Sequence, residues 1–340
     1  MLTMINVDEA IGMVLAHDIT KVIPGVFKGP AFRRGHVIKA EDVSELLKLG
    51  KENIYIMQLG DDEIHEDDAA RRMGRAIAGP GLELTEPKEG RVNLTAKSPG
   101  LLKVDVQLLK EINSIDEVIV STLHDQTLCQ VGTVVAGTRT MHLTISDSLL
   151  RRIEHMCQDR GGIVKLLPLK TKRIGVVITG NEVYKGRIKD GFADIIRQKV
   201  TAFGSTLEYK TIVPDDADII GESIKEFISS GAQAIVVCAG LSKDPDDCTL
   251  EGIRRSGAEI VTYGAPVLPG SMFVYAVCDD IPIIGAAACV LHSPTTILDI
   301  ILPRVLTDQR ITKEEIIELG HGGLCLGCST CYFPACPFGK

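Results

Sequence analysis

The chain has 340 residues, of which 45% are hydrophobic, and its formal net charge is −8. This length holds two or three domains, and an acidic balance without a basic block argues against a partner bound through nucleic-acid phosphates. The longest apolar run, Ile281–Leu291, is too short to span a bilayer, and the first residues lack the basic and apolar segments of a secretory signal. We therefore expect a cytoplasmic protein that binds neither nucleic acid nor a membrane.

Residues 1–60 form the first predicted region. Ala40–Leu49 carries an apolar helical stripe and stops at Gly50, and Lys51–Met57 has the composition of a strand. We predict an α+β segment here.

Residues 61–170 form a second predicted region with a different pattern. Short Val-rich stretches broken by Gly indicate strands, and helices are expected over Asp67–Ile77 and Gln107–Asn113. The pattern predicts a small, β-rich α+β accessory domain.

Residues 171–307 are predicted to form the main domain. Arg173–Thr179 and Ala234–Cys238 are unbroken apolar runs, which indicate strands covered on both faces. The segments predicted between them are a helix, a strand and a helix, over Phe192–Phe203, Thr206–Val213 and Ile219–Ile228. This alternation predicts an α/β fold with a doubly wound, mostly parallel sheet, whose ligands collect at the carboxyl ends of the strands.

Five short motifs follow one another in this domain. They are Thr179-Gly180-Asn181-Glu182; Gly186 with Asp190; Pro214-Asp215-Asp216; Gly240 and Ser242 with Asp247 and Thr249; and Pro269-Gly270. The series resembles the molybdopterin-binding domain of molybdenum-cofactor biosynthesis proteins, which molybdopterin adenylyltransferases and molybdotransferases share. The likeness covers Thr171–Leu306, and Val7–Asp18 resembles the opening of the molybdotransferases.

The resemblance implies a function and assigns residues to it. It implies a molybdenum-cofactor biosynthesis transferase that binds molybdopterin or its adenylate and assists Mg²⁺-dependent molybdate insertion. Asp247 and one of Asp215 and Asp216 would serve metal binding and catalysis. The pterin would be bound by Thr179, Gly180, Glu182, Asp190, Gly240, Ser242, Thr249, Pro269 and Gly270. A homodimer, an accessory domain that covers the pterin or joins the dimer, and a molybdoenzyme apoprotein as partner are implied as well.

The residue types suit this chemistry, although each has a simpler explanation. Backbone N–H groups of small-residue turns bind phosphate, and Gly permits close approach. Carboxylates hold Mg²⁺ through few protein ligands and several waters. Taken singly, Pro214-Asp-Asp is a good helix cap, and Gly180 and Gly240 suit tight turns.

Departures from the family pattern leave a second function open. Cys238-Ala239-Gly240 stands where Thr-Gly-Gly is usual, Ser271-Met272 where a lysine is usual, and Ile284–Ala288 where Leu-Pro-Gly-Asn-Pro is usual. Losing charged donors from an anion site costs about 1.5–3 kcal/mol each. The alternative is a non-catalytic molybdopterin carrier or sensor.

Residues 308–340 are predicted to form a helix over Thr312–Leu319 and a cysteine-rich tail. Its four cysteines, Cys325, Cys328, Cys331 and Cys336, follow a C-x2-C-x2-C-x4-C-P pattern. The bacterial ferredoxin pattern is one residue tighter at the last step, whereas zinc sites usually have two separated pairs. An iron–sulfur cluster, Zn²⁺ and unmetallated or redox-active thiols all remain open.

Overall fold

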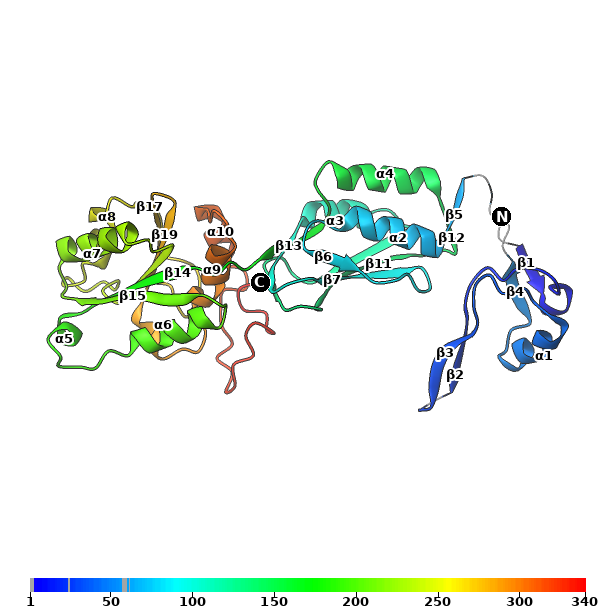
Figure 1. Cartoon of the computed structure of the whole chain (residues 1–340), viewed down its shortest axis with the longest axis horizontal. Helices are drawn as coiled ribbons and strands as arrows, with labels where there is room; N and C mark the ends of the chain where they lie inside the picture. Colours follow the sequence, from blue (N-terminus) through cyan, green and yellow to red (C-terminus); the bar gives the residue numbers. More distant parts are fainter. Residues whose placement is uncertain (1–2, 24, 57–59, 61) are drawn as a thin grey trace. The chain divides into compact units, whose positions relative to one another are not determined.

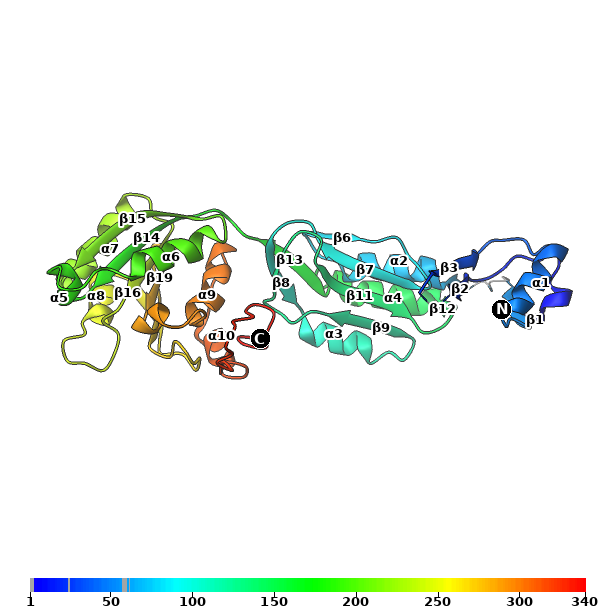
Figure 2. The ribbon, with the colours of Figure 1, turned by 90° about the horizontal axis from the view of Figure 1, so that it is seen from below.

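The computed structural model describes residues 3–23, 25–56, 60 and 62–340. These residues form two compact units. The first runs to residue 166 without residues 99–101 and 126–128, and the second contains those two short segments and residues 167–340. Figures 1 and 2 show the elements of both units in two views. In the described ranges, no helix is long and apolar enough to cross a bilayer.

The first unit begins with a small α+β region around one helix. Its strands pair antiparallel, β1 (Thr3–Asn6) with β4 (Asn53–Ile56) and β2 (Ile19–Ile23) with β3 (Phe27–Phe32). The predicted helix is observed as α1 (Ala40–Lys48). The predicted strand over Lys51–Met57 is observed as β4, and Met57 lies outside the described residues.

The rest of the first unit is built around a four-stranded antiparallel sheet in the order β6-β7-β11-β9. These strands are Leu82–Leu84, Arg91–Ala96, Val134–Thr140 and Val118–Thr122. The predicted helices are observed as α2 (Glu66–Ile77) and α3 (Val106–Asn113), and α2 packs against the sheet and against α4 (Asp147–Gln158). Two further strands of this unit are β5 (Glu63–His65) and β12 (Thr144–Ser146), whereas β8 (Gly100–Val104), β10 (Leu128–Cys129) and β13 (Val164–Pro168) each contain residues of both units.

The second unit contains a six-stranded sheet in the order β15-β14-β16-β19-β18-β17. The strands are Thr206–Val213, Arg173–Thr179, Ala234–Cys238, Ile281–Ala286, Phe273–Cys278 and Glu259–Tyr263. Neighbours among β15, β14, β16 and β19 are parallel, whereas β18 runs antiparallel to β19 and to β17. The predicted α/β class with a mostly parallel sheet is confirmed.

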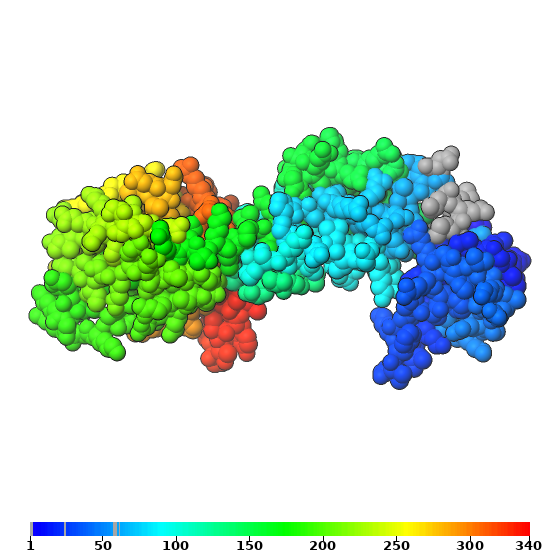
Figure 3. Space-filling view, in the orientation of Figure 1, coloured from blue at the N-terminus to red at the C-terminus, as the bar shows by residue number. Residues whose placement is uncertain are grey.

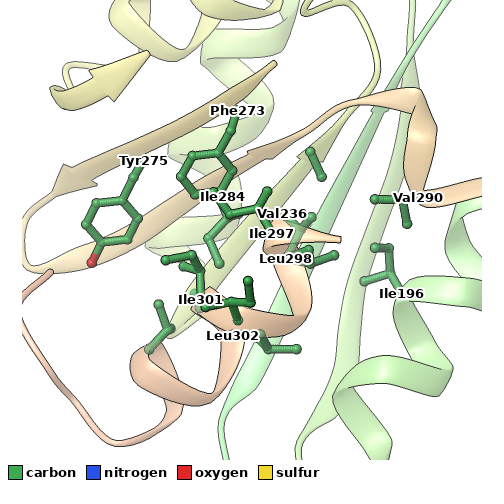
Figure 4. Close-up of a cluster of buried hydrophobic side chains, with 14 of the residues drawn as sticks. Ile196, Val236, Phe273, Tyr275, Ile284, Val290, Ile297, Leu298, Ile301 and Leu302 are labelled. Atoms are coloured by element: carbon green, nitrogen blue, oxygen red, sulfur yellow. The ribbon is translucent and has the colours of Figure 1, made fainter. Parts of the chain in front are cut away.

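Helices cover both faces of this sheet. One face carries α6 (Phe192–Thr201), α9 (Ile297–Leu306) and α10 (Lys313–Glu318), and the other carries α7 (Ala217–Ser229) and α8 (Thr249–Arg255). Alternate residues of β14 and β16 enter the two cores, so residues 174–178 of β14 and the whole of β16 are apolar. Figure 4 shows the first core, in which Ile301 and Leu302 of α9 meet Phe273 and Ile284 of the sheet.

The helix α9 differs from its sequence-based expectation. The pattern predicts a helix over Thr295–Val305 that Pro303 interrupts, yet α9 continues through Pro303 to Leu306. Thr296 caps its start, where its side chain accepts a hydrogen bond from the N–H of Leu298 at 3.2 Å. Nine of the ten residues of α9 are buried, and only Asp299 in its first turn is half-buried. Tertiary packing therefore maintains the helix despite the hydrogen bond that proline cannot make.

The contact between α7 and α8 depends on Gly252. A Cβ atom there would lie 2.6 Å from Ile220 Cβ and 3.2 Å from the carbonyl oxygen of Ala217. Alanine favours helix by about 1 kcal/mol over glycine, but overpacking a rigid contact costs about 1–3 kcal/mol.

We predict that Gly252→Ala lowers the free energy of unfolding, measured by circular dichroism. The exposed control Glu222→Ala should change it by less than about 0.5 kcal/mol; a Gly252→Ala protein as stable as its parent would contradict this packing.

Candidate functional site

The predicted site residues lie at the ends of neighbouring strands. Because β14, β15, β16 and β19 are parallel, their carboxyl ends meet at one edge of the sheet. Thr179 ends β14, Cys238 ends β16, and Pro214 follows β15. The antiparallel strand β18 begins at this edge, since Phe273 pairs with Ala286 at the end of β19. The segments after Thr179, Val213 and Cys238 and before Phe273 are therefore brought together here.

Two buried hydroxyl groups join the β14 and β16 ends. Thr179 Oγ1 donates to the carbonyl oxygen of Cys238 at 3.2 Å and lies 3.1 Å from Thr249 Oγ1. Both threonines are fully buried. Because the Thr179 hydroxyl donates its only proton to the Cys238 carbonyl, the Thr249 hydroxyl is the donor in the bond between the two threonines. Both hydroxyl groups are used in hydrogen bonds within the protein, so these side chains support the site and do not contact a ligand.

The two hydroxyl groups leave no room for a side chain at Gly240. A Cβ atom at Gly240 would lie 2.3 Å from Thr249 Oγ1 and 2.8 Å from Thr179 Oγ1, and its φ is +61°. The residue before it, Ala239, also has a positive φ of +72°. A side chain in this conformation costs about 1–2 kcal/mol. The departure Cys238-Ala239-Gly240 thus keeps the turn while adding strain at Ala239.

The turn at Gly240 leaves backbone donors available. The N–H of Ala239 continues the ladder to Ala286 at 3.0 Å, and the carbonyl oxygen of Gly240 accepts from the N–H of Thr249 at 3.2 Å. Among the hydrogen bonds of the described residues, none uses the N–H of Gly240 or of Leu241. Leu241 is buried. Buried N–H groups are nearly always paired, so this turn offers two donors to a ligand.

Gly180 forms the corresponding junction after β14. It adopts φ +138° and precedes the short helix α5 (Asn181–Tyr184). A Cβ atom at Gly180 would lie 2.8 Å from Glu182 Oε1. Glu182 itself is exposed at the start of α5.

The three aspartates proposed for catalysis each accept backbone N–H groups. Asp215 Oδ2 accepts from Asn181 at 2.9 Å, and Asp247 Oδ2 accepts from Ser242 at 2.6 Å. Asp216 Oδ1 caps α7, since it accepts from the first N–H groups of that helix at 2.9 and 3.2 Å. The capping explanation therefore describes Asp216, whereas Asp215 connects the β15 end to the β14 end.

The charges of these aspartates converge on Cys248. Burial first, and then the negative charges of Asp215, Asp216 and Asp247, raise the pKa of the Cys248 thiol. The three carboxylates are thus close enough to act on one side chain. In the described part of the chain, however, no three His, Cys, Asp or Glu side chains are placed to hold a metal ion together.

Asp190 has a structural partner that the sequence motifs do not indicate. Its Oδ1 accepts from the N–H groups of Phe192 at 2.8 Å and Ala193 at 3.2 Å at the start of α6, and Lys210 Nζ lies 2.6 Å from its Oδ2. Burial raises the pKa of Asp190, but these hydrogen bonds outweigh burial and the pKa is lowered. The alternating pattern of the edge strand β15 places Lys210 on the more exposed side of the strand, but it does not indicate Asp190 as the partner.

Pro269 and Gly270 lie against the start of α9. The carbonyl oxygen of Pro269 accepts from the N–H of Ile297 at 3.3 Å. Gly270 is buried with φ +117°, and a Cβ atom there would lie 3.0 Å from the same nitrogen. This close approach requires glycine.

The tail cysteines lie together but do not form a ligand cluster. Cys325, Cys328, Cys331 and Cys336 all line one cavity of about 480 Å³, together with Leu268, Pro269 and the segment 292–295. All four are free thiols.

Two family models match the chain. Residues 175–307 match a probable molybdopterin binding domain, and residues 4–58 match a domain of unknown function, DUF8806. The first range includes every predicted pterin-binding residue from Thr179 to Gly270.

Curated relatives match a part of this domain. A CinA-like protein of Citrifermentans bemidjiense is 33% identical over 89 residues, which cover 26% of this chain and 21% of that protein. A protein of Archaeoglobus fulgidus is 33% identical over 81 residues, which cover 24% of this chain and 35% of that protein. The chain thus spans about a fifth to a third of the length of these relatives.

Solved structures give distant matches. The molybdopterin biosynthesis enzyme MoaB from Thermus thermophilus has 17% identity and a TM-score of 0.33, over 41% of this chain and 98% of that one. A molybdenum cofactor biosynthesis protein from Pyrococcus furiosus has 10% identity and a TM-score of 0.27, over 92% of this chain and 66% of that one. By the match to the family model, residues 175–307 belong to the probable molybdopterin-binding domain family.

Proposed function

We propose that the chain binds molybdopterin, or its adenylate, at the carboxyl edge of the second unit's sheet. The observation that supports this most directly is the turn at Gly240, where the N–H groups of Gly240 and Leu241 have no acceptor among the described residues. A pterin phosphate supplies such acceptors, and glycine lets it approach the backbone. The family match over residues 175–307 supports the same ligand.

The acidic residues at this edge fit a role in holding Mg²⁺ between protein and phosphate. Mg²⁺ is usually bound by one or two carboxylates together with substrate phosphates and waters, so a preformed group of three ligands is not required. Asp215 and Asp247 each use Oδ2 for a backbone N–H group, and no described hydrogen bond uses the other oxygen. Bound there, Mg²⁺ would neutralise phosphate charge beside these carboxylates.

On this basis we place the chain among transferases that assist molybdate insertion into molybdopterin. AMP would leave when the adenylate is the substrate, and the product would pass to a molybdoenzyme apoprotein, with the chain acting as a homodimer. The names of the solved neighbours, which refer to molybdopterin and molybdenum cofactor biosynthesis, agree with this assignment.

One observation favours the alternative of a carrier or sensor. The segments that usually supply a lysine and an amide read Ser271-Met272 and Ile284–Ala288 here, and neither contains a charged or amide side chain. Lys210 of β15 is paired with Asp190, its Nζ lying 2.6 Å from Oδ2. Anion binding would then rest on backbone N–H groups, which suffices for binding but gives little extra stabilisation of a transition state.

The first prediction tests the turn. Gly240→Ala places a methyl group against the Thr249 and Thr179 hydroxyl groups and shifts the two free N–H groups, so we expect molybdopterin affinity to fall at least about tenfold, or about 1.4 kcal/mol. Isothermal titration calorimetry measures this affinity in the parent protein and the variant. Gly257→Ala is the matched control, because Gly257 also has a positive φ, +90°, but a Cβ atom there meets nothing within 4 Å. Equal affinity in the two variants would contradict the role of this turn.

The second prediction separates catalysis from binding. Asp247→Asn keeps an acceptor for the N–H of Ser242 but removes the charge, so we expect molybdopterin affinity to remain within about threefold while Mg²⁺-dependent AMP release falls about 100-fold or more. The control is Asp246→Asn in the same exposed loop. Unaltered AMP release in Asp247→Asn would remove Asp247 from catalysis, and binding without any AMP release by the parent protein would establish the carrier instead of the transferase.

A further inference from the structure

The cysteine-rich tail is fixed to the second unit without further regular structure. Beyond the end of α10 at Glu318, all residues are described and none lies in a helix or a strand of more than one residue. Two hydrogen bonds of 2.8 Å hold its start, from the N–H of Leu268 to Gly323 and from the N–H of Cys325 to Leu268. Its end is held by Phe338, which is buried in the core that contains α9. Figure 3 shows the tail, in red, protruding from the surface of this unit.

The two ends of the cysteine motif are anchored, and its middle is exposed. Cys325 and Cys336 are half-buried and pack against the core. Cys328 and Cys331 are exposed, and Cys331 Sγ lies 3.1 Å from Thr295 Oγ1. The exposed Cys328 and Cys331 thus lie, along the chain, between two cysteines that pack against the core.

All four thiols face the same cavity, and its lining is chemically selective. Besides the cysteines, the lining includes His292, Tyr332 and several apolar side chains, and it includes no Asp or Glu among the described residues. Hard cations such as Mg²⁺ prefer oxygen ligands, whereas Zn²⁺ and iron–sulfur clusters prefer thiolates. The cavity therefore favours a soft metal over the cation expected at the aspartates.

The other six cysteines of the chain are unlike these four. Cys129, Cys157 and Cys238 are buried in the cores of the two units. Burial raises the pKa of the Cys157 thiol to about 11. In the tail, by contrast, two half-buried and two exposed cysteines line one cavity.

We propose that Cys325, Cys328, Cys331 and Cys336 bind one thiolate-coordinated metal centre, either Zn²⁺ or an iron–sulfur cluster. No three of them are placed for coordination in the described structure, so binding draws the exposed segment 326–332 toward the anchored thiols and closes the cavity. Two-residue spacings keep the first three cysteines within reach of one centre. Each coordinating thiol releases its proton to solvent on binding, and the cluster form takes iron and sulfide from the medium.

The test uses the full-length protein purified without oxygen and analysed for zinc, iron and acid-labile sulfide. We expect either one zinc per chain or iron with sulfide in equal amounts, and the four tail cysteines should resist a thiol reagent that modifies them once the metal is removed. Protein stripped of metal is then titrated with Co²⁺, which reports thiolate ligands through a charge-transfer absorption band. One equivalent should produce this band.

The variant pair makes the test specific to the tail. Cys328→Ser combined with Cys331→Ser changes two exposed residues, so the fold should persist by circular dichroism while metal affinity falls about 100-fold or more. Cys278→Ser combined with Cys289→Ser, two half-buried cysteines outside the tail, is the control and should keep the metal. Absence of zinc, iron and sulfide together with no cobalt band, or equal metal binding by both double variants, would overturn the proposal.

Discussion

The candidate site depends on the contact between Thr179, Thr249 and Gly240. Parallel pairing of β14 with β16 brings two strand ends to one edge, but it does not by itself shape them. The buried hydroxyl pair ties the end of β14 to the start of α8, and Gly240 fits only because it has no side chain. This small arrangement turns the chain sharply after β16 and leaves two N–H groups without a protein acceptor. Because Thr249 is the first residue of α8, that helix begins at this contact.

The same edge combines backbone donors with carboxylates. An anion placed there meets N–H groups at Gly240 and Leu241, but it also meets the charges that raise the pKa of Cys248. A phosphate therefore gains from a divalent cation between it and Asp215 or Asp247. The tail cavity offers thiols and an imidazole instead, so the second unit separates oxygen-ligand chemistry from sulfur-ligand chemistry. The two regions remain linked through Leu268, which bonds to the tail and precedes Pro269.

Sequence patterns predict the main domain well because the apolar strand runs and the alternation of strands with helices are both strong signals. Short continuous apolar runs are typical of strands covered on both faces, and the predicted run Ala234–Cys238 is observed as the fully buried strand β16 with the same bounds. Pro303 shows the limit of local rules, since the burial of nine of the ten residues of α9 outweighs the loss of one hydrogen bond. The motif residues are brought to one edge, yet they have different roles there. The Thr179 side chain is buried and Asp216 caps a helix, and the spacing of the motifs alone does not distinguish such structural roles from ligand binding. The Lys210–Asp190 pair joins distant segments, so no local pattern specifies it.

The central claim is that a pterin phosphate binds the backbone at the Gly240 turn. Amide hydrogen exchange of the full-length protein, with and without molybdopterin and Mg²⁺, tests it most directly. The account predicts slowed exchange in peptides that cover residues 239–242, whereas peptides from the first unit's four-stranded sheet should be unchanged. Binding that slows exchange elsewhere and leaves the Gly240 turn unaffected, or the absence of any ligand-dependent change, would contradict it.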